Sequence, residues 1–297
     1  MKKYLFVLSA LVLFTFSSCT KPGNPMTKDF VIEGSYTELE VQDAFDVTVS
    51  NTVSQITVTT GENVMPKVVV EKIDNKLKIY LRPITISGSN ELKVVLPYNA
   101  DLKGVDLSGA SEFHSEYGLY GEKIEVELSG ASDFYCDIEA DEIEIDLSGS
   151  SSFHGKAAAD KVKVHMSGSS DYFGDVLADG INLDLSGSSS IEGNVSANSL
   201  DLDLSGASVA TLEGQVTELK IDLEGSSNIV KKVVGNRYAL ACDNCEGNMS
   251  GSSDAYIHCD GNIKVNLSGS SELHFTGNAF TGDSTTSNDS SIIHDVL

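Results

Sequence analysis

Four of the five cysteines could support either metal binding or disulfide formation. Cys242 and Cys245 form a Cys-x-x-Cys pair, a spacing that is used for zinc binding and for thiol redox reactions. A zinc site needs further ligands close by, and the sequence offers only the scattered Cys259 and His258. We therefore expect no metal and no cofactor, and we favour structural disulfides over zinc or free thiols. The candidate disulfide residues are Cys136, Cys242, Cys245 and Cys259, with three possible full pairings.

The fifth cysteine, Cys19, ends a segment that resembles a bacterial lipoprotein signal peptide. Two lysines at positions 2 and 3 precede the apolar stretch 4–16, which is too short to span a bilayer. The Phe-Ser-Ser-Cys segment at 16–19 resembles a lipobox, with Phe in place of the usual Leu. The sequence therefore predicts cleavage after residue 18 and lipidation of Cys19. The alternative is ordinary cleavage that leaves Cys19 as a spare thiol.

Serine nucleophiles and paired carboxylates are the two catalytic arrangements that this composition suggests. Most serines stand in copies of one short motif, whereas a catalytic triad needs one unique serine with a placed histidine. Acidic pairs of the kind used by glycosidases occur throughout the sequence and therefore discriminate nothing. A polysaccharide lyase needs basic groups for its acidic substrate, yet the repeat region has a single arginine, Arg237. We expect a protein without catalytic residues.

These residues must be positioned by a repeat of about 19 residues. Its motif is an apolar residue followed by Ser-Gly and a short Ala-Ser or Ser-Ser pair, and the glycines are spaced 21, 19, 19, 19, 19, 19, 26 and 18 residues apart. Before each motif, apolar and polar residues alternate, as in a strand with one buried face. A unit of this size cannot bury its own apolar face. The sequence thus predicts an all-β, single-chain β-solenoid (β-helix) whose coils stack on one core, with glycine at the corners.

Stacking of the coils places one mostly acidic column on the surface, three residues before each glycine. Its members are Asp106, Glu127, Asp146, His165, Asp184, Asp203, Asp222, Asn248 and Asn266. Carboxylates about 4.8 Å apart repel by roughly 0.9 kcal/mol even in bulk water. We favour a solubilising face, with Ca²⁺ or a basic partner as the alternative. The calcium-binding repeat Gly-Gly-x-Gly-x-Asp is absent.

A second column lies five residues after each glycine, and its first members are aromatic. We treat His114, Tyr135, His154 and Phe173 as candidate ligand-binding residues, because outward rings offer a stacking surface to sugars. The alternative is that the rings only pack against each other. His114 and His154 lie two rungs apart, about 9.6 Å. This is too far to share a metal whose nitrogen ligands lie about 2 Å from it.

The repeat also predicts how the chain is divided. We expect a signal peptide at 1–18, a lipid-anchored tether at 19–30, and a β-rich N-terminal cap with early coils at 31–100. The regular Ser-Gly solenoid follows at 101–281, and a polar, loosely docked C-terminal tail at 282–297. Within the cap, the Ile-Ser-Gly segment at 86–88 is a candidate for a degenerate first copy of the motif.

One segment of the cap, together with the repeat, carries a family resemblance. Phe45-Asp46-Val47, followed by strands and then by Leu-Ser-Gly-Ala-Ser copies, resembles the family described as putative auto-transporter adhesin, head GIN domain. The resemblance covers roughly residues 36–280. It implies a β-helix-like all-β fold, export in a Gram-negative bacterium, and a cell-surface or periplasmic role in which adhesion is the suggested activity. The family has no established catalytic motif, so the resemblance implies no catalytic position here.

The net charge narrows the choice of partners. Without residues 1–18 the chain has 18 basic and 44 acidic residues, a net charge of −26. Nucleic acids and anionic membrane surfaces require clustered Lys and Arg, so we expect no nucleic-acid partner. We expect a non-enzymatic cell-envelope lipoprotein, lipid-anchored in the outer membrane, that acts as an adhesion or structural module toward a glycan or protein surface. The alternatives are a carbohydrate-binding solenoid that uses the aromatic column and a polysaccharide-processing enzyme.

Overall fold

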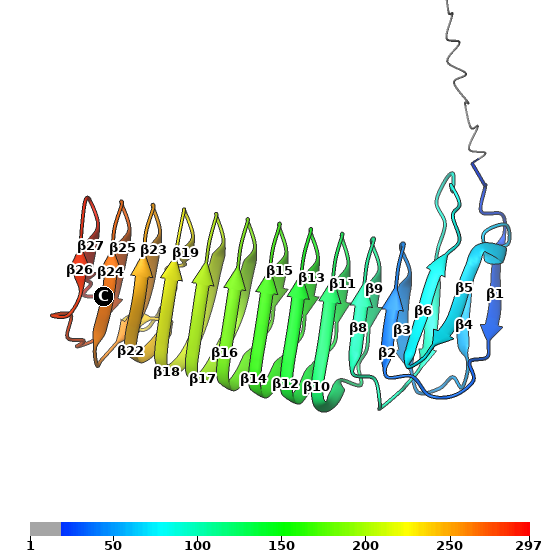
Figure 1. Ribbon diagram of the computed structural model, residues 1–297, viewed down its shortest axis with the longest axis horizontal. Helices are drawn as coiled ribbons and strands as arrows, with labels where there is room; N and C mark the ends of the chain where they lie inside the picture. The colour runs from blue at the N-terminus through cyan, green and yellow to red at the C-terminus, as the bar shows by residue number, and fades with distance from the viewer. Residues whose placement is uncertain (1–18) are drawn as a thin grey trace, which may run out of the picture.

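The chain folds into a β-solenoid, a rod of stacked coils (Figure 1). The computed structural model describes residues 19–297, so the expected signal peptide at 1–18 lies outside the described residues. About ten coils stack along one axis, and the strands of successive coils pair in parallel. The predicted fold class is thus confirmed. Within residues 19–297, no helix is long and apolar enough to cross a membrane.

A regular coil combines a long strand, the glycine corner and a short strand. The long strands are β8 (Gly104–Leu107), β10 (Leu119–Leu128), β12 (Ile138–Leu147), β14 (Ala157–Met166), β16 (Val176–Leu185), β22 (Leu240–Met249) and β24 (Ile263–Leu267). The strands after the corners are β9 (Glu112–His114), β11 (Asp133–Tyr135), β13 (Ser152–His154), β15 (Asp171–Phe173), β19 (Asn228–Ile229), β23 (Asp254–Cys259) and β25 (Glu272–Thr276). In β17 (Ser190–Leu204) and β18 (Val209–Leu223), the short strand after one corner continues without a break into the long strand before the next corner. The alternating apolar side chains face inward and form one continuous core.

Each corner depends on its glycine and on the second serine of the motif. The repeat glycines have φ between +74° and +81°, a region that costs other residues about 1–2 kcal/mol. The second serines are fully buried and lie at Ser111, Ser132, Ser151, Ser170, Ser189, Ser208, Ser227, Ser253 and Ser271. Each donates to the carbonyl three residues before it; the Oγ of Ser170 lies 3.1 Å from the carbonyl oxygen of Ser167. The structure thus confirms that the motif residues form the corners.

The N-terminal cap contains a first coil that lacks the sequence motif. β2 (Glu38–Val41) and β3 (Asp46–Ser50) pair in parallel with β8 and β9, so residues 41–43 take the place of residues 107–109. Asp43 adopts φ +74° where the repeat has glycine. The expected copy at 86–88 is wrong, because Ile86 forms only an isolated bridge with Thr20. Aspartate tolerates the left-handed region better than most residues, so the first coil was hidden from a search for glycine.

The remaining cap strands close the end of the rod. β6 (Lys76–Leu81) and β7 (Lys93–Pro97) pair in parallel with β2 and β3 and add one further coil. β5 (Val68–Ile73) and β4 (Ile56–Gly61) then pair antiparallel with them, and η1 (Met65–Lys67) connects β4 to β5. Antiparallel strands at the end of a solenoid protect it from pairing with another sheet.

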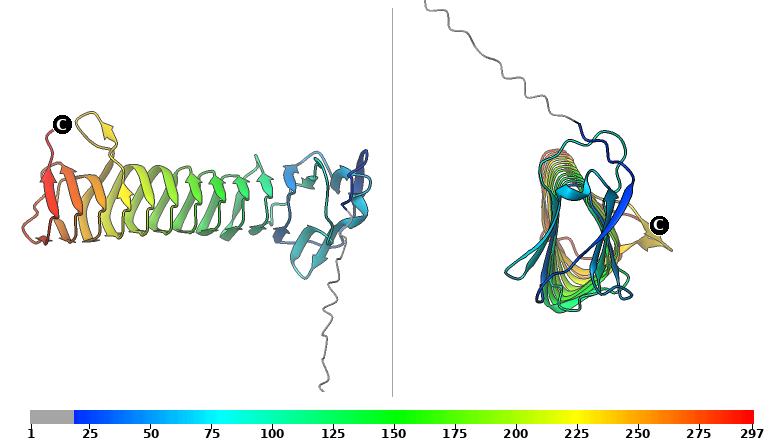
Figure 2. Two further views of the ribbon diagram at one scale, coloured as in Figure 1. Left: turned by 90° about the horizontal axis from the view of Figure 1, so that it is seen from above. Right: turned by 90° about the vertical axis from the view of Figure 1, so that its right-hand side faces the viewer.

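Both segments that we expected to be loose are part of the sheet. β1 (Pro25–Phe30) pairs antiparallel with β4, so residues 19–30 do not form a free tether. β26 (Thr285–Thr286) and β27 (Ser291–His294) pair in parallel with β24 and β25 and extend the solenoid through the expected tail at 282–297. Main-chain hydrogen bonds hold these strands, which is why their side chains show little apolar periodicity. The 26-residue spacing between Gly225 and Gly251 contains additional residues. They form a hairpin, β20 (Val233–Val234) and β21 (Arg237–Tyr238), that projects from the rod (Figure 2).

Candidate functional site

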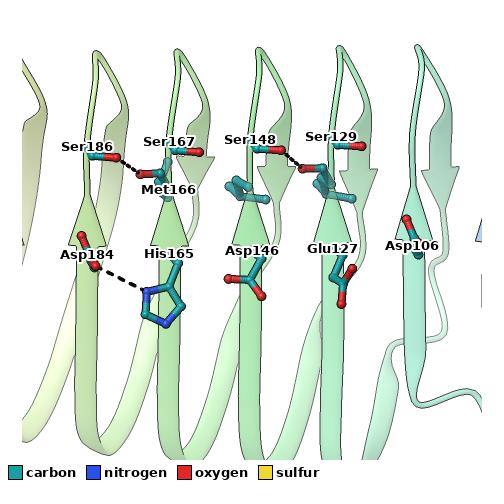
Figure 3. Close-up of a pocket in the computed structure, with 12 residues that line it drawn as sticks. Asp106, Glu127, Ser129, Asp146, Ser148, His165, Met166, Ser167, Asp184 and Ser186 are labelled. Atoms are coloured by element: carbon teal, nitrogen blue, oxygen red, sulfur yellow. Dashed lines mark hydrogen bonds and ion pairs between the residues drawn. The ribbon is translucent and has the colours of Figure 1, made fainter.

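The acidic column lines a groove along one face of the rod. Figure 3 shows Asp106, Glu127, Asp146, His165 and Asp184 on successive strands, below the first serines of the corners. The groove has a volume of about 450 Å³. Three of its four serines donate their hydroxyls to the backbone of the preceding coil; for example, Ser186 Oγ donates to the carbonyl of Met166 at 3.2 Å. These three hydroxyls therefore contribute to the contacts between successive coils.

Burial and mutual repulsion raise the pKa of several carboxyl groups in this column. For Asp106, Glu127 and Asp203, partial burial is the largest cause of the raised pKa, and neighbouring carboxylates add to it. The column also contains positive charges, which reduce the repulsion between its carboxylates. It begins in the cap with Lys78, whose Nζ lies 2.7 Å from a carboxylate oxygen of Glu40. Ionisation of these carboxyl groups therefore destabilises the folded protein, as expected for a row of like charges.

We expect Asp203→Asn to stabilise the protein at pH 7. A raised pKa means that the folded chain binds the proton more tightly than the unfolded chain, so stability is lost as the pH rises through the folded pKa. Removing this charge should increase the free energy of unfolding by a few tenths to about 1 kcal/mol, limited by solvent screening. The gain should vanish near pH 3, where the wild-type carboxyl is protonated. Denaturant unfolding between pH 3 and pH 8 measures it.

Asp175→Asn is the matched control with the opposite sign. Hydrogen bonds from the side chain and main chain of Asn194, at 2.9 and 3.1 Å, lower the pKa of Asp175. A lowered pKa contributes stability above the unfolded pKa, so this variant should be less stable than the wild type at pH 7. A loss of stability at pH 7 for Asp203→Asn would contradict our account of the column.

The four candidate aromatic residues form a stacked ladder. The ring centroids of His114 and Tyr135 lie 4.4 Å apart, those of Tyr135 and His154 4.5 Å, and those of His154 and Phe173 4.9 Å, with interplanar angles of 5° to 17°. Burial lowers the pKa of His154 and favours its neutral form. Tyr135 and His154 are covered on both faces by neighbouring rings. They therefore offer only their edges to a ligand, whereas sugars stack on ring faces.

Asp46 adds a cluster of possible metal ligands to the N-terminal end of this ladder. One ligand atom each of Asp46, Glu112 and His114 lies within 4.8 Å of the others, and this is the only such group of three in residues 19–297. We expected no metal from the sequence and missed the cluster, because Asp46 belongs to the hidden first coil, in register with Glu112. An alignment of Phe45-Asp46-Val47 with residues 111–113 would have found it. Lys93, in register with Asp46 on its other side, supplies a positive charge there.

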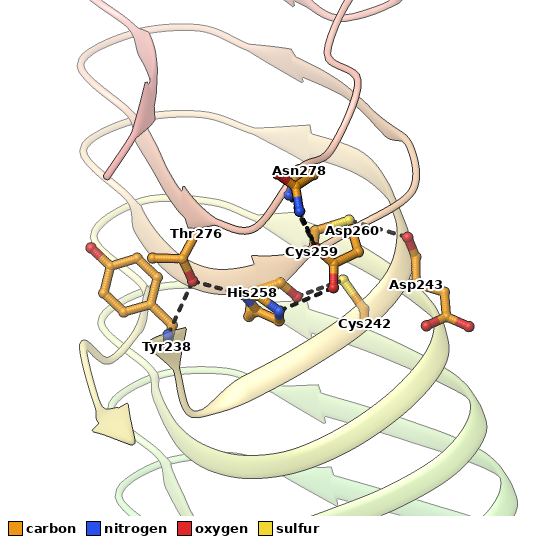
Figure 4. Close-up of polar contacts among 8 residues, drawn as sticks. All are labelled: Tyr238, Cys242, Asp243, His258, Cys259, Asp260, Thr276 and Asn278. Carbon is orange, nitrogen blue, oxygen red and sulfur yellow. Dashed lines mark hydrogen bonds and ion pairs between the residues drawn. The ribbon is translucent and has the colours of Figure 1, made fainter. Parts of the chain in front are cut away.

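Three of the four candidate disulfide cysteines, Cys242, Cys245 and Cys259, lie close together on β22 and β23, and none of them is in a disulfide; Figure 4 shows Cys242 and Cys259. Cys242 is in register with Cys259 of the next coil, and Cys245 follows on the same strand. The pKa of Cys242 is raised, chiefly by a hydrogen bond with Cys245 and also by burial, and this suits unreactive thiols. A disulfide among these three stays a prediction.

Cys136 lies out of reach of the other cysteines. Along the sheet register, Ile138 lies five coils from Leu240, or about 24 Å. A disulfide joins Cα atoms less than about 7 Å apart. A disulfide of Cys136 with any of the other three is therefore excluded, which rules out the three full pairings and leaves one disulfide among the other cysteines as the prediction. Burial raises the pKa of the Cys136 thiol to about 12.

A hydroxyl–imidazole–carboxylate chain that sequence spacing did not reveal lies on β25, on β23 and directly after β23 (Figure 4). His258 Nδ1 lies 3.0 Å from Thr276 Oγ1, and its Nε2 lies 3.3 Å from a carboxylate oxygen of Asp260. Hydrolases use such a chain to activate a nucleophile. Here Thr276 is only 3% exposed, and its Oγ1 accepts the amide proton of Tyr238 at 3.1 Å. These hydrogen bonds therefore hold the hairpin against the coil, and the hydroxyl of Thr276 is buried beneath it.

The chain matches one protein-family model and is similar to several solved structures. A protein-family model described as putative auto-transporter adhesin, head GIN domain, matches residues 35–179 and 173–279. The chain is similar to a putative adhesin from Parabacteroides distasonis ATCC 8503, with 19% identity and a TM-score of 0.46 over 94% of this chain and 98% of that chain. It is also similar to a putative adhesin from Parabacteroides merdae ATCC 43184, with 16% identity and a TM-score of 0.46 over 93% and 98%. A putative lipid binding protein from Parabacteroides distasonis ATCC 8503 shares 17% identity, with a TM-score of 0.47 over 94% and 100%. No curated protein matches the chain.

Proposed function

Because the chain belongs to the family of putative auto-transporter adhesins with a head GIN domain, we propose that it is an exported adhesion module of the Gram-negative cell envelope. In this proposal, lipid on Cys19 anchors it to the outer membrane, and it carries no catalytic activity. Its partner is a glycan or a protein surface that meets the side of the rod.

One observation carries the proposal: the repeated residues that could perform chemistry are engaged in holding the coils together. The second serine of each corner is buried and hydrogen-bonded to the backbone, and the first serines line the acidic groove. The outer aromatic rings are stacked on each other. A rod of similar rungs offers long, regular faces, which suit binding to an extended surface better than the unique geometry that catalysis needs.

The N-terminal end of the fold supports attachment close to a membrane. Directly after Cys19, the amide of Thr20 donates to the carbonyl of Thr85 at 2.7 Å, and Ser87 donates back to Thr20 at 2.9 Å. Lipid on Cys19 would therefore hold the cap against the bilayer without a long spacer. About ten coils, each adding about 4.8 Å, would place the C-terminal end about 50 Å along the rod from the cap.

We expect Cys19→Ala to release the protein from the membrane fraction. A lipid anchor contributes roughly 0.8 kcal/mol for each buried methylene, and no helix among the described residues offers a membrane span in its place. The measurement is fractionation of cell envelopes with immunodetection. Cys136→Ala, which changes a buried cysteine in the rod, is the control and should stay with the membranes. If Cys19→Ala also stays there, the proposed lipid anchor is wrong.

A further inference from the structure

The cap contains a cleft whose lining differs in chemistry from that of the acidic groove. It lies between the loop that follows β1, the start of β4 and the end of β7, and its volume is about 350 Å³. Its lining residues are Phe30, Val31, Ile32, Gly34, Ser35, Tyr36, Ser54, Gln55, Ile56, Pro97, Tyr98 and Asn99. The volume is near the lower end of the range for small-molecule sites, about 300–1,000 Å³. It therefore suits a ligand of a few rings rather than a protein segment.

The lining of the cleft carries no formal charge. None of its residues is Asp, Glu, Lys, Arg or His, although 22% of the chain is charged and the acidic groove displays carboxylates along its whole length. A charged ligand would lose its hydration in this cleft without gaining an ionic partner. The absence of charge in an otherwise acidic protein thus favours a neutral ligand.

Three residues that line the cleft have polar groups without a protein partner. Within residues 19–297, the hydroxyls of Tyr36 and Tyr98 and the side-chain amide of Gln55 make no hydrogen bond to the protein. Asn99 differs, because its Nδ2 donates to the carbonyl of Tyr36 at 2.8 Å and its Oδ1 accepts from the amide of Asp101 at 3.0 Å. Asn99 therefore fixes the shape of the cleft, whereas the other three groups are free to bind a ligand.

Tyr98 offers the stacking surface that the aromatic ladder lacks. Its side chain is 39% exposed, and its ring meets Tyr117 at 5.1 Å with a tilt of 46°, so no parallel ring covers it. Aromatic rings beside unpaired hydroxyl and amide groups match a sugar, which presents an apolar face and a rim of hydroxyls. An acyl chain would leave those polar groups unpaired, which costs free energy.

We propose that this cleft binds a neutral oligosaccharide, with Tyr98 against the face of one sugar ring and with Tyr36 and Gln55 hydrogen-bonded to its hydroxyls. The proposal goes beyond the adhesion function and does not depend on it, because the cleft would bind the same ligand wherever the protein is anchored.

Calorimetric titration of the full-length protein, purified in a detergent without a sugar headgroup, tests the proposal. The probes are maltotriose, mannotriose and N,N′,N″-triacetylchitotriose up to about 10 mM, since an open cleft of this size binds weakly. We expect at least one of them to bind and Tyr98→Ala to weaken it by about tenfold or more. Tyr36→Phe, which removes only a hydroxyl, should weaken it less. Trigalacturonate, a charged comparator, should bind more weakly than the neutral probe.

Two control variants separate the cleft from other tyrosines. Tyr120→Ala, which removes a 53% exposed tyrosine outside the cleft, should leave the affinity unchanged, and so should Tyr135→Ala in the aromatic ladder. Unchanged melting temperatures would show that each variant is folded. The proposal is overturned if no neutral probe binds, if Tyr98→Ala binds like the wild type, or if Tyr135→Ala alone abolishes binding. Tighter binding of 1-decanol than of any sugar would assign the cleft to an acyl chain instead.

Discussion

Replacing Gly168 by alanine is expected to destabilise the protein by about 3 kcal/mol or more. Gly168 has φ +80°, and a Cβ placed on it would lie 2.6 Å from the carbonyl oxygen of Gly149 in the preceding coil. The substitution therefore adds a backbone clash to the cost of a left-handed conformation. The clash is hard to relieve, because the amide of Ser169 donates to the same carbonyl at 2.7 Å. Denaturant unfolding followed by circular dichroism measures the loss.

Gly180→Ala provides a matched control one coil further along the rod. This glycine lies within β16 and has no positive φ, and a Cβ placed on it would have Ser199 Oγ as its nearest neighbour, at 3.5 Å. An alanine fits there and relieves the entropic cost of glycine in a strand, so stability should be unchanged or should rise by up to about 1 kcal/mol. Equal effects of the two substitutions would contradict our description of the corners.

Phe153→Ala is the second substitution with a large expected effect, a loss of about 3–5 kcal/mol. Phe153 is fully buried, and its ring stacks between Phe134 at 5.1 Å and Tyr172 at 4.8 Å in a ladder inside the core. Removing the ring leaves a cavity and exposes two ring faces that no other side chain can cover. Neighbouring coils each depend on this rung, so the whole rod should unfold at a lower denaturant concentration.

Phe173→Ala is the control for the inner ladder. Phe173 belongs to the outer ladder, is 39% exposed, and stacks on His154 at 4.9 Å. We expect a loss of less than about 1.5 kcal/mol, because one surface aromatic contact is worth about 0.5–1.5 kcal/mol beyond the area it buries. A similar loss for both variants would mean that the two ladders are not distinguished by burial, contrary to the structure.

The repeat could be predicted from the sequence because the regular coils use the same residue types at the same positions. Leu147, Gly149 and Ser151 satisfy a core position, a left-handed corner and a buried hydroxyl, and the same three requirements return in every coil. The segments that escaped prediction depart from this motif. Asp43 replaces the corner glycine, and β1 and β27 join the sheet through main-chain hydrogen bonds that leave no apolar pattern.

The candidate sites were harder to predict, because they depend on distances across the fold. The positions that align in successive coils could be counted from the repeat length. The aromatic residues from His114 to Phe173 were therefore correctly placed together. Counting could not reveal that their rings stack on one another, nor that Cys136 lies far from Cys242. The cap cleft joins residues from three segments, near Tyr36, Gln55 and Tyr98, that are related by no repeat. No period in the sequence connects them.

Surface labelling of intact cells tests the proposed adhesion role most directly. The hairpin of β20 and β21 projects from the rod, and the space around Gly235 is open, so an epitope inserted after Gly235 should leave the coils intact. An adhesion module must face the outside of the cell. The account predicts that an antibody to the epitope labels intact cells as strongly as cells with a permeabilised outer membrane. Labelling that appears only after permeabilisation would place the rod in the periplasm and contradict a role in adhesion.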